Sequence, residues 1–292
     1  MRVQLVVTGD MEHLALGPAL ERILSAAGGD VQFLQPRKLG DGAITTSPLP
    51  PLSSPQTPAT VKRMAKTLVA ETLSGRTGSP PDLVVGIDDL ELANAHQPQV
   101  VVSWVRRALN EEVSARCSSQ DAAERMKRVL RERCSFHLLV PLVEAYLFGE
   151  PAALARAGVA SGVAVHRLGA DLESFETDDP GFLPRAEKEN AKKAALGAPW
   201  WREERHPKRY LEFLVESSGA LLYDETVNGV RALRTLDWIL VASTSPLLFA
   251  RALFEDISDL LGIANPLGPG SCSPHTYPAK NVRRETLMLR NL

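Results

Sequence analysis

The chain has 292 residues, 44% of them apolar and 23% charged, a composition that excludes a disordered, collagenous or coiled-coil protein. Its 33 Lys and Arg residues and 35 Asp and Glu residues give a net charge of -2. Any contact with nucleic acid must therefore come from a local basic patch, because the field of the whole molecule supplies no attraction.

Cysteine content and hydropathy predict a cytoplasmic protein. The 3 cysteines are too few for a disulfide framework, and a chain of this length can bury a sufficient core without one. The first 13 residues carry Asp10 and Glu12 where a signal peptide would have its apolar segment. No uncharged stretch reaches the ~20 residues that a membrane span needs, so we expect no membrane contact.

The first elements predict a β-α-β unit. Residues 2–8 are apolar and β-branched, which is typical of a buried strand. Apolar positions from 12 to 27 then recur at helical spacing until Gly28 and Gly29. Residues 31–34 form the next short strand.

A long loop and a second unit follow. Six of the 21 prolines fall within residues 36–58, so we expect an exposed excursion there. A helix is predicted from Thr60, because Thr can cap it and apolar positions then recur at helical spacing. The next strand is expected at 83–87 and ends at Asp88 and Asp89.

The remainder is predicted to be mainly helical. Amphipathic helices are expected at 98–113 and 121–133. Residues 136–149 are apolar on nearly every side except at Glu144, and a buried carboxylate needs a metal, an Arg or a hydrogen-bond partner. Residues 160–205 have the composition of an irregular surface insertion. Three more helices are expected at 207–217, 225–241 and 246–261.

These elements predict an α/β fold with a mostly parallel sheet flanked by helices and a helical C-terminal part. We expect an α/β core over residues 1–160. Residues 161–292 would hold the irregular insertion and the helices that pack on the core.

Acidic residues gather where the predicted strands end. The carboxyl ends of parallel strands meet at one edge of a sheet, so acids from separate strands can share a divalent cation there. Mg²⁺ or Mn²⁺ prefers such oxygen ligands and bridges to phosphate, which favours phosphodiester hydrolysis. The predicted ligands are Glu12, Asp88, Asp89 and Glu91, with Asp10 in reserve and Glu144 completing or orienting the shell.

Each of these acids also has a structural interpretation. Asp88 and Asp89 can cap the helix that follows them, and Glu12 favours the N-terminus of the first helix. His13 and His137 lie near acids in the sequence, but we expect both to be structural.

Three segments resemble a known family. They are residues 8–12 (TGDME), 88–91 (DDLE) and 140–146 (VPLVEAY). They are similar to Toprim-like bacterial proteins of unknown function that accompany ATPases in anti-phage operons, and the resemblance covers residues 1–150. It implies a Toprim-like sheet and an Mg²⁺ site for DNA or RNA cleavage, within a defence complex.

The chain departs from the family pattern twice. Thr8 stands where the family usually has Glu, so its role would pass to Glu12 or be lost. The segment 88–91 is not a clean Asp-x-Asp pair. The alternative to a nuclease is therefore a non-catalytic assembly subunit that docks an ATPase or a second copy of itself. A small-molecule phosphohydrolase using the same site would need an enclosed pocket.

Cations and aromatics alternate near residue 205, a pattern typical of a nucleic-acid surface. The predicted contacts are Arg202, Lys208 and Arg209. Alternatively, Trp200 and Trp201 anchor the insertion on the core while the cations are solvated.

Other chemistries lack their motifs. The sequence has no Walker A loop, no G-x-G-x-x-G after a strand and no G-x-S-x-G elbow. Cys272 and His275 form half a zinc motif, but no second pair accompanies them.

Overall fold

The computed structural model describes residues 1–292 with the exception of 41, 77, 220–221, 270–276 and 279–287. Cys272 and His275, the half zinc motif, lie outside the described residues. No helix in the described part is both long enough and apolar enough to cross a membrane.

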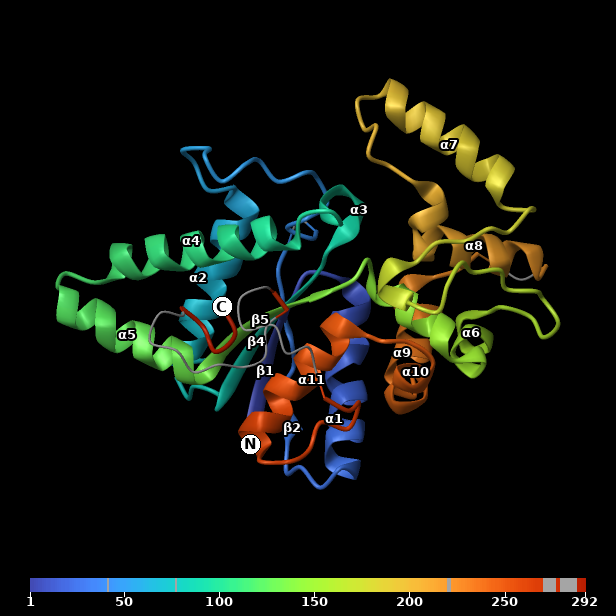
Figure 1. Ribbon diagram of the computed structural model, residues 1–292. Helices are drawn as coiled ribbons and strands as arrows, with labels where there is room; N and C mark the ends of the chain where they lie inside the picture. The colour runs from blue at the N-terminus through green and yellow to red at the C-terminus, as the bar shows by residue number, and fades with distance from the viewer. Residues whose placement is uncertain (41, 77, 220–221, 270–276, 279–287) are drawn as a thin grey trace.

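A parallel sheet lies at the centre (Figure 1). The main strand order is β2-β1-β4-β5, and β3 pairs with the end of β1 beyond β2. All of these pairings are parallel, so the predicted α/β class with a parallel sheet is confirmed. The strands are β1 (Arg2–Val7), β2 (Gln32–Phe33), β3 (Arg37–Lys38), β4 (Leu83–Asp89) and β5 (Cys134–Leu139).

Helices cover both faces of the sheet (Figure 1). One face packs against α2 (Ala59–Ser74), α4 (Pro98–Arg116) and α5 (Gln120–Arg133). The other packs against α1 (Gly17–Ala26) and α11 (Leu248–Leu261). Both faces are therefore buried, which explains why the strands are apolar at nearly every position.

Side chains of the central strands alternate between these two cores. Leu5 and Val7 of β1 pack beneath α1 and α11, whereas Val6 packs on the opposite side. Gly86 of β4 allows a close approach of α2, because a Cβ there would lie 3.0 Å from the Leu68 side chain. Ala in its place would force the Leu68 or Phe136 side chain to shift by a few tenths of an ångström.

The remaining helices form a lobe beside the carboxyl ends of the strands (Figure 1). Several of them are short and connected by irregular segments. The exception to this arrangement is α3 (Glu91–Asn94), which lies beside the start of α4 (Figure 1). The helices of the lobe are, in chain order, η2 (Val143–Gly149), α6 (Pro151–Ala157), η3 (Leu172–Ser174), α7 (Leu183–Ala195), η4 (Glu203–Arg205), α8 (Pro207–Ser217), η5 (Glu225–Gly229), α9 (Val230–Arg234) and α10 (Trp238–Thr244).

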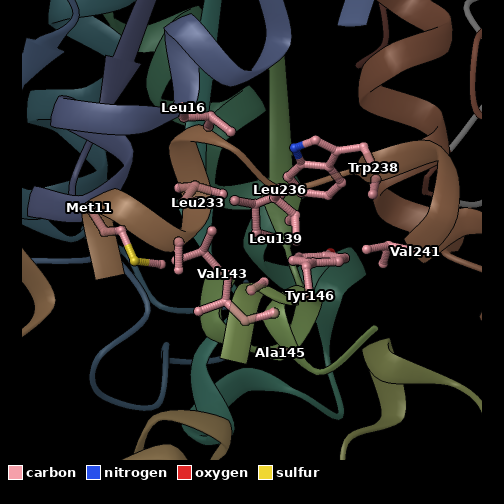
Figure 2. Close-up of a cluster of buried hydrophobic side chains, with 14 of the residues drawn as sticks. Met11, Leu16, Leu139, Val143, Ala145, Tyr146, Leu233, Leu236, Trp238 and Val241 are labelled. Carbon is pink, nitrogen blue, oxygen red and sulfur yellow. The ribbon is translucent and has the colours of Figure 1, made fainter. Parts of the chain in front are cut away.

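One apolar cluster joins this lobe to the sheet (Figure 2). The rings of Tyr146 and Trp238 lie 5.0 Å apart at its centre. Tyr146 follows β5, and Trp238 begins α10, so packing between them couples the two parts. The cluster also includes Met11, Leu16, Leu139, Val143, Leu233, Leu236 and Val241.

Three expectations about local structure need correction. The loop at 36–58 is not wholly exposed, because Ile44 and Leu49 are buried in the core under α2 and α4. Asn94 fixes it by accepting from the Leu49 amide at 2.9 Å and donating to the Thr45 carbonyl at 2.7 Å. The segment 160–205 is not irregular throughout, since it contains α7.

Two further segments change direction, and no secondary structure was predicted for the first of them. Residues 136–149 are the end of β5, a turn with a cis peptide bond at Val140–Pro141, and the 3₁₀ helix η2. The helix expected at 225–241 is divided into η5, α9 and α10. Asp237 starts α10 anew by accepting hydrogen bonds from the amides of Ile239 and Leu240, both at 3.1 Å.

A distant carboxylate holds the first turn of α11. Glu173 accepts hydrogen bonds from the Phe249 amide at 2.9 Å, the Ala250 amide at 2.9 Å and the Tyr146 hydroxyl at 3.0 Å. These are amides that an α-helix leaves without an internal partner. Burial nevertheless raises the pKa of Glu173 to about 7.

Residues 288–292 lie against β5 and close its edge. The Arg290 amide donates to the Cys134 carbonyl at 2.8 Å, and its guanidinium contacts Asp256 at 3.0 Å. His137 lies 3.3 Å from the same carboxylate, so it is a structural histidine as expected. Burial alone would raise the pKa of Asp256, but the hydrogen bond with His137 and the Arg290 charge lower it to about 2.

Candidate active site

A cavity of about 320 Å³ opens where β1 and β4 end. This is the edge of a parallel sheet at which ligands bind in α/β proteins. Six carboxylates line it against two lysines, Lys38 and Lys208. The acids are Asp10, Glu12, Asp89, Glu91, Glu144 and Glu225.

Glu12 lies in the π-helical turn η1 (Glu12–Leu16), directly after β1. Its side chain is only 4% exposed and folds back over Gly9. A Cβ on Gly9 would lie 2.0 Å from Glu12 Oε2, so glycine is required for this position of the carboxylate. Single π-helical turns of this kind are frequent at functional sites.

The ionisation of Glu12 is strongly perturbed. Burial raises its pKa from 4.5 to about 7, and the charge of Glu225 adds to the rise. Hydrogen bonds with its own amide and with Asp89, together with the Lys208 charge, oppose it.

Asp89 and Glu91 reach the cavity from the end of β4. The Val143 amide donates to Asp89 Oδ1 at 3.0 Å, which ties the segment after β5 to this strand. Glu91 has a φ of 49°, in the left-handed region that non-glycine residues rarely adopt. Burial raises the pKa of both acids, and for Asp89 the charges of Glu12 and Glu144 add to the rise.

Asp88 does not line the cavity, contrary to the expectation that it joins Asp89 there. Successive residues of a strand point to opposite faces, so these two carboxylates diverge. Asp88 accepts hydrogen bonds from the Thr8 hydroxyl and from the Ile44 amide, the latter at 3.1 Å. Its carboxylate therefore joins β1, β4 and the loop after β3.

Thr8 also has a structural role. It stands where the Toprim-like resemblance leads us to expect Glu, and its hydroxyl donates to Asp88. The residue is 5% exposed at the cavity floor. Glu12, four residues further along, supplies the carboxylate at the end of β1 instead.

Glu144 is 2% exposed, and its counterion is Lys208. The distance from Lys208 Nζ to Glu144 Oε1 is 3.9 Å, and the same ammonium pairs with Glu225. Burial raises the pKa of Glu144 to about 8, with Glu225 and Glu12 adding to the rise and Lys208 opposing it. The charge of Lys208 thus compensates both Glu144 and Glu225 in a cluster that contains several more acids.

Sequence analysis missed Glu225 and Lys38. Glu225 begins η5, whose N-cap is Asp224. In the sequence it therefore looks like an acid that stabilises the first turn of a helix. Lys38 ends β3 and pairs with Asp10 at 2.5 Å. No local signal in the sequence shows that these two residues line the same cavity, because their elements are far apart in the chain.

The three basic residues predicted to bind nucleic acid lie in three different cavities. Lys208 lines the acidic cavity. Arg202 lines a cavity beside Val140 and Pro141, and Arg209 lines one beneath α7. They do not form one patch.

The donor set fits a hard divalent cation, since carboxylate oxygens are the ligands that Mg²⁺ and Mn²⁺ prefer. As placed, however, no group of three or more His, Cys, Asp or Glu side chains among the described residues could hold a metal ion. The cavity therefore contains carboxylate oxygens of the kind that bind Mg²⁺ or Mn²⁺, but they are not arranged as a complete coordination shell.

Comparison of the chain with protein-family models, with curated proteins and with solved structures gives no match. The Toprim-like resemblance accordingly stays a prediction, and the site has to be interpreted from its own geometry.

Proposed function

We propose that the protein is a divalent-cation-dependent phosphodiester hydrolase, a nuclease, with its site in the acidic cavity. One observation carries this proposal: six carboxylates surround a cavity at the carboxyl edge of the sheet, with two lysines between them. Mutual repulsion and burial make such a cluster costly, and perturbed carboxylates in a cleft mark a functional site.

Glu12, Asp89 and Glu144 are the residues that would hold the cation. A bound Mg²⁺ or Mn²⁺ supplies a polarised phosphate and an activated water. The cation would compete with Lys208 for Glu144, because one ammonium now compensates that carboxylate. Glu91 and Glu225 lie on the same cavity and would orient or replace these ligands.

Two further elements of the proposal come from the resemblance. We place the activity in a bacterial defence complex, with DNA or RNA as substrate. A partner ATPase would then activate or deliver the nuclease.

Cleavage of plasmid DNA and structured RNA with Mg²⁺ or Mn²⁺ tests the proposal. We expect cleavage by the wild type, its loss in Glu12→Gln and Asp89→Asn, and its retention in Glu132→Gln, an exposed acid on α5. Absence of cleavage together with absence of Mn²⁺ binding by calorimetry would overturn it. Hydrolysis of nucleoside monophosphates without cleavage of DNA or RNA would indicate a small-molecule phosphohydrolase.

A non-catalytic assembly subunit is the second candidate. It is favoured by the lack, within the described residues, of any acid group arranged to hold a metal ion. The calorimetric experiment separates the two candidates, since the subunit would bind no Mn²⁺ in the acidic cavity.

A further inference from the structure

A second cavity, of about 430 Å³, lies between α7 and the segment 200–209 and is basic. Five cations line it with one tryptophan, against the two acids Glu189 and Glu203. The cations are Arg185, Lys188, Lys192, Lys193 and Arg209, and the tryptophan is Trp201.

The sequence of α7 explains how one helix presents so many cations. Arg185, Lys188, Lys192 and Lys193 follow at spacings of three, four and one, which places them on one face. The helix buries only Ala186 among its residues. Asn190 attaches it to the protein by donating to Glu204 Oε2 and accepting from the Glu203 amide, both at 2.7 Å.

The ion pairs inside this cavity are weak competitors for a ligand. Arg185 pairs with Glu216 at 2.7 Å, Arg209 with Glu212 at 2.8 Å and Lys192 with Glu189 at 3.3 Å, but the side chains of all three cations are more than two-fifths exposed. Exposed pairs of this kind contribute little to stability, so a phosphate can replace the carboxylates. Lys188 is exposed and has no ion-pair partner among the described residues.

A buried histidine lies beside these cations. His206, at the start of α8, is 7% exposed and packs against Trp201 with ring centroids 5.1 Å apart. Burial, together with the charges of Arg209, Lys208 and Lys193, lowers the pKa of His206 to about 3.

The basic cavity is also connected to the acidic one through the chain. Within the segment 200–209, Arg209 faces the basic cavity and Lys208 the acidic cavity. Trp200, Arg202 and Arg205 line a third cavity, also about 430 Å³, beside the turn after β5. One continuous segment thus contributes basic residues to all three cavities, and in the third they stand beside Glu173 and Glu176.

We propose that the basic cavity under α7 binds the phosphate backbone of single-stranded nucleic acid and holds the strand that the acidic cavity cleaves. The bases of a single strand are free to stack on an aromatic side chain, whereas those of a duplex are not. Trp200, half-buried at the third cavity, gives a base a ring to stack on. The inference names a substrate site and rests on the proposed function.

The test measures binding without cleavage. Anisotropy of a fluorescent single-stranded DNA of about 16 nucleotides is recorded in EDTA, over about 50 to 200 mM salt. For the double variant Lys188→Ala, Lys192→Ala we expect affinity to fall about tenfold and the salt slope to decrease by about 1.4, the value for two lost phosphate contacts on a single strand. The matched control is Arg125→Ala, Arg128→Ala, two exposed cations on α5 at the other side of the molecule (Figure 1).

The outcomes separate this inference from the proposed function. Equal affinities for the wild type and the double variant, or an equal loss in the control, would overturn the inference. Tight binding of ATP or pyrophosphate without binding of the oligonucleotide would also overturn it. If the oligonucleotide binds as expected but no cation supports cleavage, the nuclease proposal fails and the binding site stands.

Discussion

Removal of one buried carboxylate should stabilise the protein. Burial and the neighbouring acids raise the pKa of Glu12 from 4.5 to about 7. The folded state thus binds the proton more tightly than the unfolded state, and the free energy of unfolding decreases as pH rises between these two values. At about 1.4 kcal/mol per pKa unit, ionised Glu12 costs about 3 kcal/mol above pH 7.

Glu12→Gln has no such cost, so we expect it to be about 3 kcal/mol more stable than the wild type near pH 8, a difference that disappears toward pH 4.5. Urea denaturation across this range measures it, with Glu132→Gln as the control. Saturating Mn²⁺ should stabilise the wild type and not the variant. A variant no more stable than the wild type at pH 8, or a difference independent of pH, would refute the reasoning.

Three further substitutions test separate parts of the structure. Gly9→Ala places a Cβ within 2.0 Å of Glu12 Oε2 and displaces that carboxylate. Mn²⁺ affinity measured by calorimetry should therefore fall about 10- to 100-fold, while the far-ultraviolet circular dichroism is preserved. An unchanged affinity would contradict a role of Gly9 in positioning Glu12. Arg290→Ala leaves Asp256 buried without its arginine and should lower the free energy of unfolding in urea by about 3 to 5 kcal/mol, and a loss below about 1 kcal/mol would argue against a buried pair. Glu173→Ala removes the acceptor of two amides at the start of α11 and should cost about 1 to 3 kcal/mol, with faster hydrogen exchange at those amides as the second readout.

The central strands β1 and β4 were predictable because they carry strong local signals, whereas β3 and β5 were not predicted. The apolar runs before Gly9 and Asp88 are buried on both faces, and such runs are typical of strands in parallel sheets. The same logic predicted acids at one edge. It treated Asp88 and Asp89 alike, although the two-residue period of a strand sends one of them into the cavity and the other away from it.

Helix α7 and the loop at 36–58 were not predictable in the same way. The helix buries only Ala186, so its sequence shows no apolar period. The loop is rich in proline, which indicates exposure, yet Asn94 binds its backbone from another part of the chain. Glu225 joined the site through packing of the C-terminal helices, a long-range contact that no local pattern contains.

The closure of β5 by residues 288–292 bears on how the chain folds during synthesis. The Phe136 amide donates to Asn291 Oδ1, a partner 155 positions further along the chain. On the ribosome the sheet therefore emerges long before the segment that closes its edge. Until that segment is synthesised, the backbone groups of β5 lack their partners in residues 290 and 291. Contacts of such separation make folding slow, so the interval in which β5 is open is also the interval in which the nascent chain is most prone to pair with another copy.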